Sequence, residues 1–160
     1  MKRKILHLVL LSGLFFAACT HRSQKKLTDL EPVFHYDADI LILRKKDTVA
    51  RFRTEFADTE AKRETGLMYR RSMKDDQSMW FIFPDEQIRY FYMKNTYIPL
   101  DIIYVNRDRK IVSAAKNARP LDETSLPSGK PAQYVLEIKG GLFDKLGLKE
   151  GDSIVVIPKK

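Results

Sequence analysis

The sequence holds a dense group of polar side chains between two apolar stretches. Four residues place an ammonium, an amide, a hydroxyl and a carboxylate within eight positions: Lys94, Asn95, Thr96 and Asp101. Unpaired polar groups are costly when buried, so such side chains either bind a ligand or satisfy one another and the backbone. In a binding site, Lys94 would attract an anionic group while Asn95 and Thr96 would form directional hydrogen bonds.

Arg70 and Glu137 extend this cluster to two further parts of the chain. In the binding interpretation, Arg70 adds a second cation for an anionic ligand. In a catalytic interpretation, Asp101 or Glu137 acts as a general base. Lys94 or Arg70 then stabilises the charge that develops on the substrate. In a structural interpretation, the same side chains form the internal ion pairs Lys94–Asp101 and Arg70–Glu137, and the neighbouring polar groups satisfy loop backbone.

Histidine chemistry is excluded within the predicted domain. The three histidines are His7, His21 and His35, and the single cysteine is Cys19, so all four precede residue 39. Nucleophile–histidine catalysis needs an imidazole beside a hydroxyl or thiol, and histidine-rich zinc sites need several imidazoles. The scattered glycines form no phosphate-binding loop. We therefore assign no catalytic residue and predict no cofactor.

Four methionines lie near one another in the sequence and offer thioethers, which are soft ligands for Cu(I). They are Met68, Met73, Met79 and Met93. No histidine or cysteine accompanies them and aromatic residues lie between them, which favours core packing. The acidic pairs Asp75-Asp76 and Asp85-Glu86 lie beside expected turns, whereas calcium would need more oxygen ligands at closer spacing. We predict no metal site.

The segment from Met1 to Ala18 has the pattern of an export signal. A basic start, Met1-Lys2-Arg3-Lys4, precedes an apolar run of fourteen residues from Ile5 to Ala18. This run is shorter than the roughly 20 residues that span a bilayer as a helix. The run ends in Phe16-Ala17-Ala18-Cys19, which resembles a bacterial lipobox and implies cleavage before Cys19 and lipidation of that residue. The alternative is an ordinary signal peptide that ends at a cysteine by chance.

The net charge of +8 first suggests a nucleic-acid or membrane partner. Three of the 29 basic residues lie in the signal, which leaves 26 basic against 21 acidic residues and a net charge of +5. This charge is spread over the chain without a patterned basic cluster, so we expect no nucleic-acid partner. The expected partners are the lipid bilayer, through acylated Cys19, and an anionic ligand, glycan or protein of the cell envelope.

The elements expected around the polar cluster are short strands with one or two short helices. Asp58 or Thr59 is a predicted helix N-cap and Gly66 the stop of that helix. A hairpin over 40–56 precedes this helix. Six strands follow it, at 79–83 (ended by Pro84), 90–93, 100–105, 110–115, 134–138 and 153–157. A surface loop is expected at 117–131 and a helical turn at 141–146. This pattern predicts an α+β fold with a mainly antiparallel, strongly curved or barrel-like sheet of about seven short strands. The predicted organisation is a signal peptide at 1–18, a lipidated flexible tether at 19–38 and one domain at 39–160.

A series of short motifs runs through the predicted domain. They are Asp58-Thr59, Arg63, Gly66-Leu67-Met68, Arg70, Met93-Lys94-Asn95-Thr96, Pro99-Leu100-Asp101-Ile102, Pro127-Ser128 and Tyr134-Val135-Leu136-Glu137. In order and spacing they resemble the bacterial and archaeal family catalogued as a domain of unknown function, number 192. The resemblance covers about residue 40 to the C-terminus. It implies a small exported or lipid-anchored domain and transfers no catalytic residue.

Three functional hypotheses follow from these observations. The first is a non-enzymatic accessory or binding module of the cell envelope, which takes an anionic small molecule, a glycan or a protein through the region Lys94–Asp101. The second is a hydrolase- or lyase-type enzyme with a carboxylate as general base. The third is a scaffold whose exposed tyrosine and phenylalanine edges dock another envelope protein.

The lipobox interpretation predicts the effect of one substitution. Cys19→Ser removes the sulfur that would carry the acyl chains, so the protein should move from the detergent-soluble membrane fraction to the soluble fraction. Immunoblotting of the two fractions measures this shift. Membrane attachment that persists in the variant contradicts the lipobox interpretation.

Overall fold

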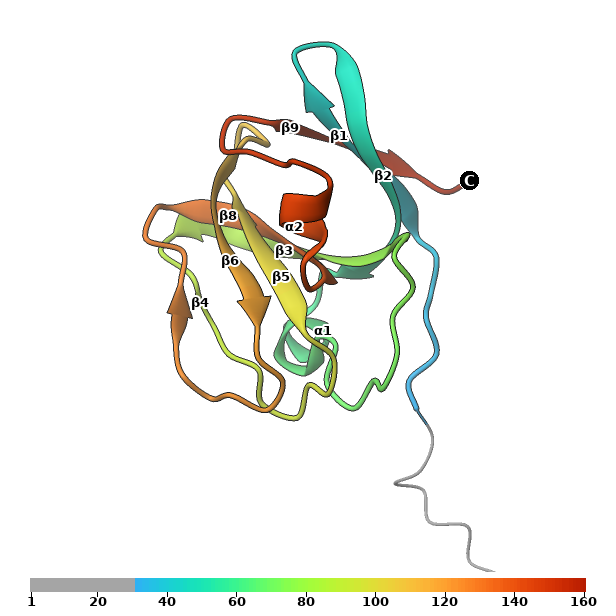
Figure 1. Ribbon diagram of the computed structural model, residues 1–160, viewed down its shortest axis with the longest axis vertical. Helices are drawn as coiled ribbons and strands as arrows, with labels where there is room; N and C mark the ends of the chain where they lie inside the picture. The colour runs from blue at the N-terminus through green and yellow to red at the C-terminus, as the bar shows by residue number, and fades with distance from the viewer. Residues whose placement is uncertain (1–30) are drawn as a thin grey trace, which may run out of the picture. The chain divides into compact units, whose positions relative to one another are not determined.

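The structure is a computed structural model that describes residues 31–160, and its core is one curved seven-stranded sheet (Figure 1). The strand order is β6-β5-β8-β3-β2-β1-β9, and a separate two-stranded sheet pairs β4 with β7. The elements are β1 (Ala38–Arg44), β2 (Asp47–Ala57), α1 (Glu60–Thr65), β3 (Gln77–Gln87), β4 (Tyr90–Phe91), β5 (Leu100–Val105), β6 (Ile111–Ala118), β7 (Leu126–Pro127), β8 (Ala132–Lys139), α2 (Leu142–Lys145) and β9 (Ser153–Pro158).

The sheet is mixed and open. All neighbouring strands are antiparallel except β2 and β3, which run parallel because α1 and its following loop connect them. The two edge strands approach each other at one corner, where Lys110 and Ser153 form an isolated bridge. The predicted α+β class with a strongly curved sheet is therefore confirmed, whereas closure into a barrel does not occur.

Two apolar clusters lie on the two faces of the sheet, because alternate residues of a strand point to opposite sides. In β3, Trp80 belongs to the first cluster while Met79 and Phe81 belong to the second. The first cluster is completed by Leu142 and Phe143 of α2. Loop residues complete the second cluster: Leu67, Met93 and Ile98. Each face of the central strands is thus buried, and a polar residue in these strands must find a partner or a cavity.

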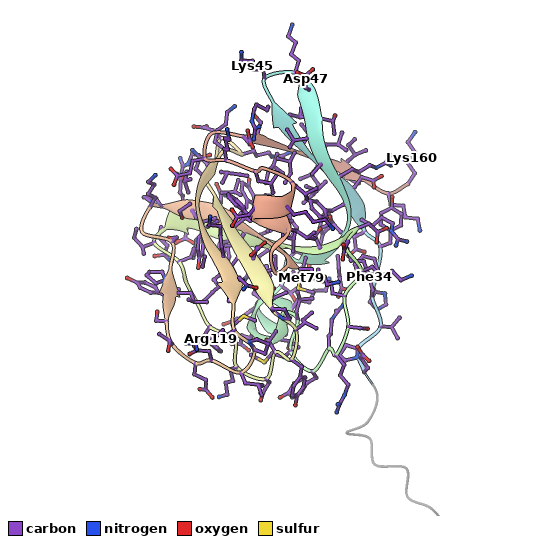
Figure 2. The ribbon with its side chains drawn as sticks, viewed as in Figure 1. Phe34, Lys45, Asp47, Met79, Arg119 and Lys160 are labelled. Carbon is purple, nitrogen blue, oxygen red and sulfur yellow. The ribbon has the colours of Figure 1, made fainter. Side chains whose placement is uncertain are left out.

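Local sequence signals account for the two tight connections around β2. The β1–β2 hairpin turns at Lys45, which has a φ of 57°, and Figure 2 shows Lys45 and Asp47 at the projecting tip of this hairpin. Helix α1 begins after Thr59, whose hydroxyl accepts a hydrogen bond from the backbone N–H of Lys62 at 3.3 Å. It ends at Gly66, whose N–H donates to the Lys62 carbonyl at 2.8 Å. The predicted N-cap and stop of this helix are confirmed.

Strand β3 continues beyond Pro84, where the sequence predicted its end. Its pairing with β8 is interrupted between Ile82 and Gln87, and Pro84 lies inside this interruption. A proline lacks the N–H that a continuous ladder requires, so it is tolerated where pairing is irregular. The strand therefore passes through Pro84 unpaired and resumes pairing at Gln87, opposite Ala132.

The chain contacts the domain from Glu31 on, ahead of the predicted domain start at Asp39. The Glu31 carboxylate accepts a hydrogen bond from the backbone N–H of Arg71 at 2.8 Å, and Asp37 accepts one from Phe56 at 2.8 Å. The predicted signal peptide, Cys19 and the tether as far as residue 30 lie outside the described residues. Neither helix of the described part is long and apolar enough to cross a membrane.

Candidate functional site

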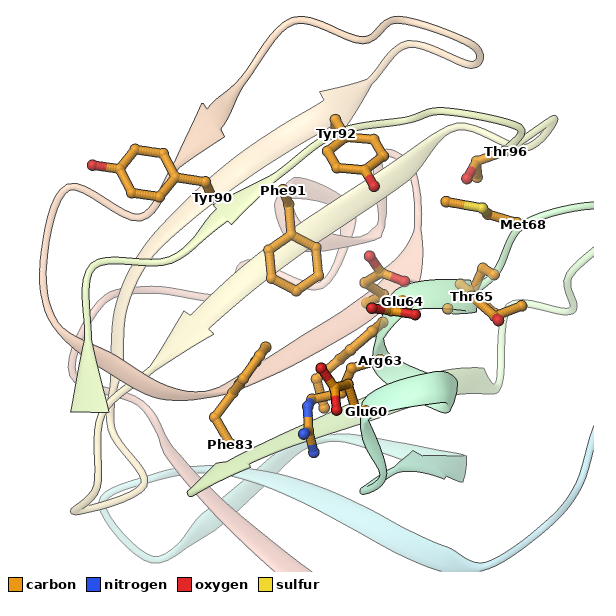
Figure 3. Close-up of a pocket in the computed structure, with 14 residues that line it drawn as sticks. Glu60, Arg63, Glu64, Thr65, Met68, Phe83, Tyr90, Phe91, Tyr92 and Thr96 are labelled. Atoms are coloured by element: carbon orange, nitrogen blue, oxygen red, sulfur yellow. The ribbon is translucent and has the colours of Figure 1, made fainter. Parts of the chain in front are cut away.

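A pocket of about 390 Å³ opens between α1, the second half of β3 and β4 (Figure 3). One side of it is aromatic and is formed by Phe81, Phe83, Tyr90, Phe91 and Tyr92. Phe91 packs edge-on against Phe81, with 5.1 Å between ring centroids, and fixes the position of this wall. Large rings of this kind offer apolar contact area with little loss of conformational entropy on binding.

Helix α1 forms the opposite side of the pocket. Its contribution consists of Glu60, Arg63, Glu64 and Thr65, and Gly66, Leu67 and Met68 continue this side. The Arg63 guanidinium donates hydrogen bonds to the Asp58 and Ile82 carbonyls, both at 2.9 Å, and lies 5.4 Å from the Phe83 ring centroid. Arg63 therefore already has partners, whereas Glu60 and Glu64 are exposed.

Glu137 is a buried residue of the lining of this pocket. It is on β8, directly opposite Met79 of β3 and Ile102 of β5, so both of its neighbours across the sheet are apolar. The residue is 5% exposed, lines the pocket, and receives no hydrogen bond on its carboxylate from any residue of 31–160. Burial disfavours the charged form and raises the pKa of Glu137 to about 8, although the nearby Arg70 guanidinium opposes this shift.

Arg70 pairs with Glu55 rather than with Glu137. One of its terminal nitrogens donates to both Glu55 carboxylate oxygens, at 2.8 and 2.9 Å, and the pair is nearly buried. Glu55 is opposite Met79 in the sheet, one strand further from Glu137. The Arg70–Glu137 ion pair of the structural interpretation is thus replaced by Arg70–Glu55, and the Arg70 Nε atom is buried without an acceptor among the described residues.

Asp101 points to the other face of the sheet from Glu137. It is opposite Ile138, and its fully buried carboxylate accepts hydrogen bonds from the backbone N–H groups of Asn117 at 2.6 Å and Phe143 at 2.7 Å. These bonds hold the end of β6 and the start of α2 against β5. Asp101 is therefore committed to backbone and does not reach the pocket.

The remaining residues of the predicted cluster have three different environments. Lys94 is exposed, and its ammonium forms no ion pair in the described part of the chain. Asn95 has a φ of 53° and donates from its amide to the Tyr69 hydroxyl at 2.9 Å. Thr96 is buried, lines the pocket, and donates to the Lys94 carbonyl at 3.2 Å. Of the six predicted site residues, the structure thus brings Thr96 and Glu137 to the same pocket.

The aromatic wall and the α1 side of the pocket were not predicted from the sequence. The available signal was Glu137 itself, a carboxylate within the apolar strand Tyr134–Ile138. A buried strand excludes an ionisable side chain unless that side chain has a partner or a cavity. Among residues 31–160, no group of three or more His, Cys, Asp or Glu side chains has the arrangement of a metal site.

The hydrogen bonds of Asp101 predict a structural role for this residue. Asp101→Ala leaves the N–H groups of Asn117 (part-buried) and Phe143 (buried) without an acceptor and should lower the free energy of unfolding by about 2–4 kcal/mol. Asp144→Ala is the matched control, because its exposed pair with Lys116 should contribute less than about 0.5 kcal/mol. Urea denaturation at pH 7 measures both values. Equal losses in the two variants would contradict this role.

The environment of Glu137 predicts how stability changes with pH. The pKa of this carboxyl is about 8 in the folded protein against an ordinary value of 4.5, so its contribution is complete below about pH 4.5. The free energy of unfolding should then fall as the pH rises to about 8 and level off above it. The total loss should be on the order of 5 kcal/mol.

Glu137→Gln removes this titration and should flatten that part of the profile. Urea denaturation from pH 4.5 to 9 measures the difference between wild type and variant at each pH. Glu64→Gln, which removes an exposed glutamate of the same pocket, is the control. A difference between wild type and Glu137→Gln that does not change with pH would contradict the assigned environment.

The chain is similar to proteins of one family and to two solved structures. A protein of unknown function from Novosphingobium aromaticivorans has 38% sequence identity, and the similarity covers 80% of this chain and 94% of that chain with a TM-score of 0.72. A protein named as a candidate transcription regulator, from Sinorhizobium meliloti, has 33% identity, covers 78% and 97% of the two chains, and gives a TM-score of 0.73. Among curated proteins, none matches the chain.

The family signature spans nearly the whole sheet. The family DUF192, described as "Uncharacterized ACR", matches residues 41–156. These residues include the motifs Met93-Lys94-Asn95-Thr96 and Pro99-Leu100-Asp101, which lead into β5, and the β8 strand that carries Glu137. The match covers more than half of the chain, and the two solved structures, at 38% and 33% identity, align over most of their length. The chain belongs to the DUF192 family.

Proposed function

We propose that this DUF192 protein is a binding module of the cell envelope that takes a small ligand in the pocket between α1 and the aromatic wall. The observation that carries the proposal is the Glu137 carboxyl, which is nearly buried, faces apolar neighbours in the sheet and lines the pocket. A buried polar group without a partner in the protein is costly for stability, and a ligand that pairs with it removes part of this cost.

The shape and composition of the pocket support this proposal. Its volume of about 390 Å³ is in the range of small-molecule sites, and its lining combines apolar with polar and charged side chains. Phe81, Phe83 and Phe91 provide the apolar surface. Thr96 and Glu137, the buried polar residues of the lining, provide hydroxyl and carboxyl groups.

The region Lys94–Asp101 gives weaker support for a binding site. Asp101 is committed to two backbone N–H groups on the opposite face of the sheet, and Lys94 is exposed. The anionic ligand expected from these residues would therefore meet no converging set of cations. The pocket offers a better site for a small molecule, or for the end of a glycan or peptide, and we place the ligand there.

The envelope location rests on the segment Met1–Cys19, which lies outside the described part. Export by a signal peptide and acylation of Cys19 would leave the domain tethered close to a membrane surface. Two or more acyl chains on one residue give stable attachment, whereas one chain binds only marginally. A binding module at this place would meet its ligand in the envelope space.

Acid–base catalysis at Glu137 is the second candidate function. The pKa of about 8 lies close to neutral pH, as is typical of a general acid or base, and the carboxyl lines a pocket. Asp101 does not share this role, because both of its hydrogen bonds go to backbone. A ligand that is recovered unchanged after prolonged incubation supports the binding module, and a converted ligand supports the enzyme.

The proposed pocket predicts the outcome of a matched pair of substitutions on α1. Thr65→Trp adds an indole at the rim of the pocket and should abolish ligand binding. Ala61→Trp adds the same ring at an exposed position of the same helix that does not line the pocket, and should leave binding unchanged.

Binding is measured by amide chemical shifts in NMR titrations with benzyl alcohol, phenylacetate and benzyltrimethylammonium. At least one of these should shift the resonances of Gly66, Leu67 and Phe91 in the wild type and in Ala61→Trp, and not in Thr65→Trp. The proposal is wrong if none of the three compounds shifts these resonances, or if Thr65→Trp retains the shifts.

A further inference from the structure

We infer that the ligand of this pocket carries a cationic group that pairs with the Glu137 carboxylate, joined to an apolar group that packs against the aromatic wall. This inference rests on the proposed binding function and specifies its ligand class. It departs from the anionic ligand that the sequence suggested, because the charges of the pocket differ from those of the region Lys94–Asp101.

The Glu137 carboxyl lacks a partner within the fold. Glu137 is 5% exposed, and its neighbours in the cross-strand row, Met79 and Ile102, offer no polar side-chain group for a hydrogen bond. No residue of 31–160 donates a hydrogen bond to its oxygens. A cationic group placed in the pocket would supply the missing partner, and charge-assisted hydrogen bonds of this kind are the stronger ones.

The cations near Glu137 are engaged elsewhere or exposed. Arg70 is the charge that acts on it, but one of its terminal nitrogens donates to both carboxylate oxygens of Glu55 on β2, and its buried Nε donates to no described residue, Glu137 included. Arg63 of α1 is held by two carbonyl oxygens and by the Phe83 ring. Lys94, in the loop after β4, is exposed and forms no ion pair in the described residues. None of these cations occupies the position of a partner for Glu137.

The walls of the pocket have the charge and character that favour a cation. Glu60 and Glu64 of α1 are exposed at the pocket and would repel an anion. On the other side, the faces of Phe91 and Tyr92 carry the negative potential that attracts cations. The walls and Glu137 thus favour the same sign of ligand charge.

Pairing of the ligand cation with the Glu137 carboxylate couples ligand binding to the protonation state of Glu137. The Glu137 pKa of about 8 means that the carboxyl is mostly protonated at neutral pH, and a cation binds its ionised form. Binding therefore releases a proton. Affinity should rise with pH by up to about 50-fold between pH 6 and pH 8, and then level off.

Three probes that share a benzyl group and differ in charge test the inference: benzyltrimethylammonium, benzyl alcohol and phenylacetate. Their charges do not change between pH 6 and pH 9, so only the protein titrates. Benzyltrimethylammonium has no N–H, so it pairs with the carboxylate through charge and with the aromatic rings through cation–π contact, without a hydrogen bond. NMR titrations of the full chain should give it an affinity about tenfold or more above that of benzyl alcohol at pH 9. Phenylacetate should bind most weakly.

Glu137→Gln keeps the shape of the side chain and removes its charge. In this variant, the affinity for benzyltrimethylammonium should exceed that for benzyl alcohol only by the contribution of cation–π contact with the aromatic wall. The affinity for benzyltrimethylammonium should also no longer depend on pH. Glu64→Gln is the matched control at the rim and should retain the rise in affinity between pH 6 and pH 8.

The possible results separate this inference from the function on which it rests. If benzyl alcohol or phenylacetate binds in the pocket as tightly as the cation, the cationic ligand is wrong and the binding module stands. The same holds if affinity for the cation falls as the pH rises, because the protonated carboxyl would then be the binding form. If no probe shifts the pocket resonances, the proposed binding function itself is wrong.

Discussion

The cross-strand row Met79, Glu137 and Ile102 is the constraint on which the site depends. Three neighbouring strands of the sheet place a carboxyl between two apolar side chains, on a face that packs against the second apolar cluster. This row is buried, so the charged form of Glu137 is disfavoured. The pocket between α1 and Phe91, which Glu137 lines, is the opening through which this carboxyl would meet the proposed ligand.

The opposite face of the same strands shows a different solution for a buried carboxylate. Asp101 is fully buried and accepts two backbone hydrogen bonds, which satisfy its oxygens and hold β6 and α2 in place. Glu55 accepts two hydrogen bonds from one terminal nitrogen of Arg70, although the Arg70 Nε atom stays without an acceptor among the described residues. Because these two carboxylates have partners, Glu137 is the buried carboxylate that a ligand would complete. The proposed binding role and the structural hydrogen bonds thus fall on different residues of one sheet.

The unpaired carboxyl also links stability to function. A group with a pKa near 8 favours the folded protein when protonated and weakens it when ionised, so the site carries a cost in stability at alkaline pH. Ligand binding to the ionised form would offset part of that cost. Binding and catalytic sites typically contain polar groups without a partner in the protein, which lower the stability of the fold.

Local signals in the sequence determined the β1–β2 turn at Lys45, the caps of α1 at Thr59 and Gly66, and the absence of histidine chemistry from residues 39–160. The turn and the caps depend on residues that are neighbours in the sequence, and the absence of histidine is a matter of composition. The site depends on pairing between distant strands: β8 inserts between β3 and β5, and this order brings Glu137 beside Met79 and Ile102. Strand alternation then sends Asp101 to the opposite face. Proximity in sequence suggested one cluster, and only the tertiary structure decided which carboxyl faces a pocket.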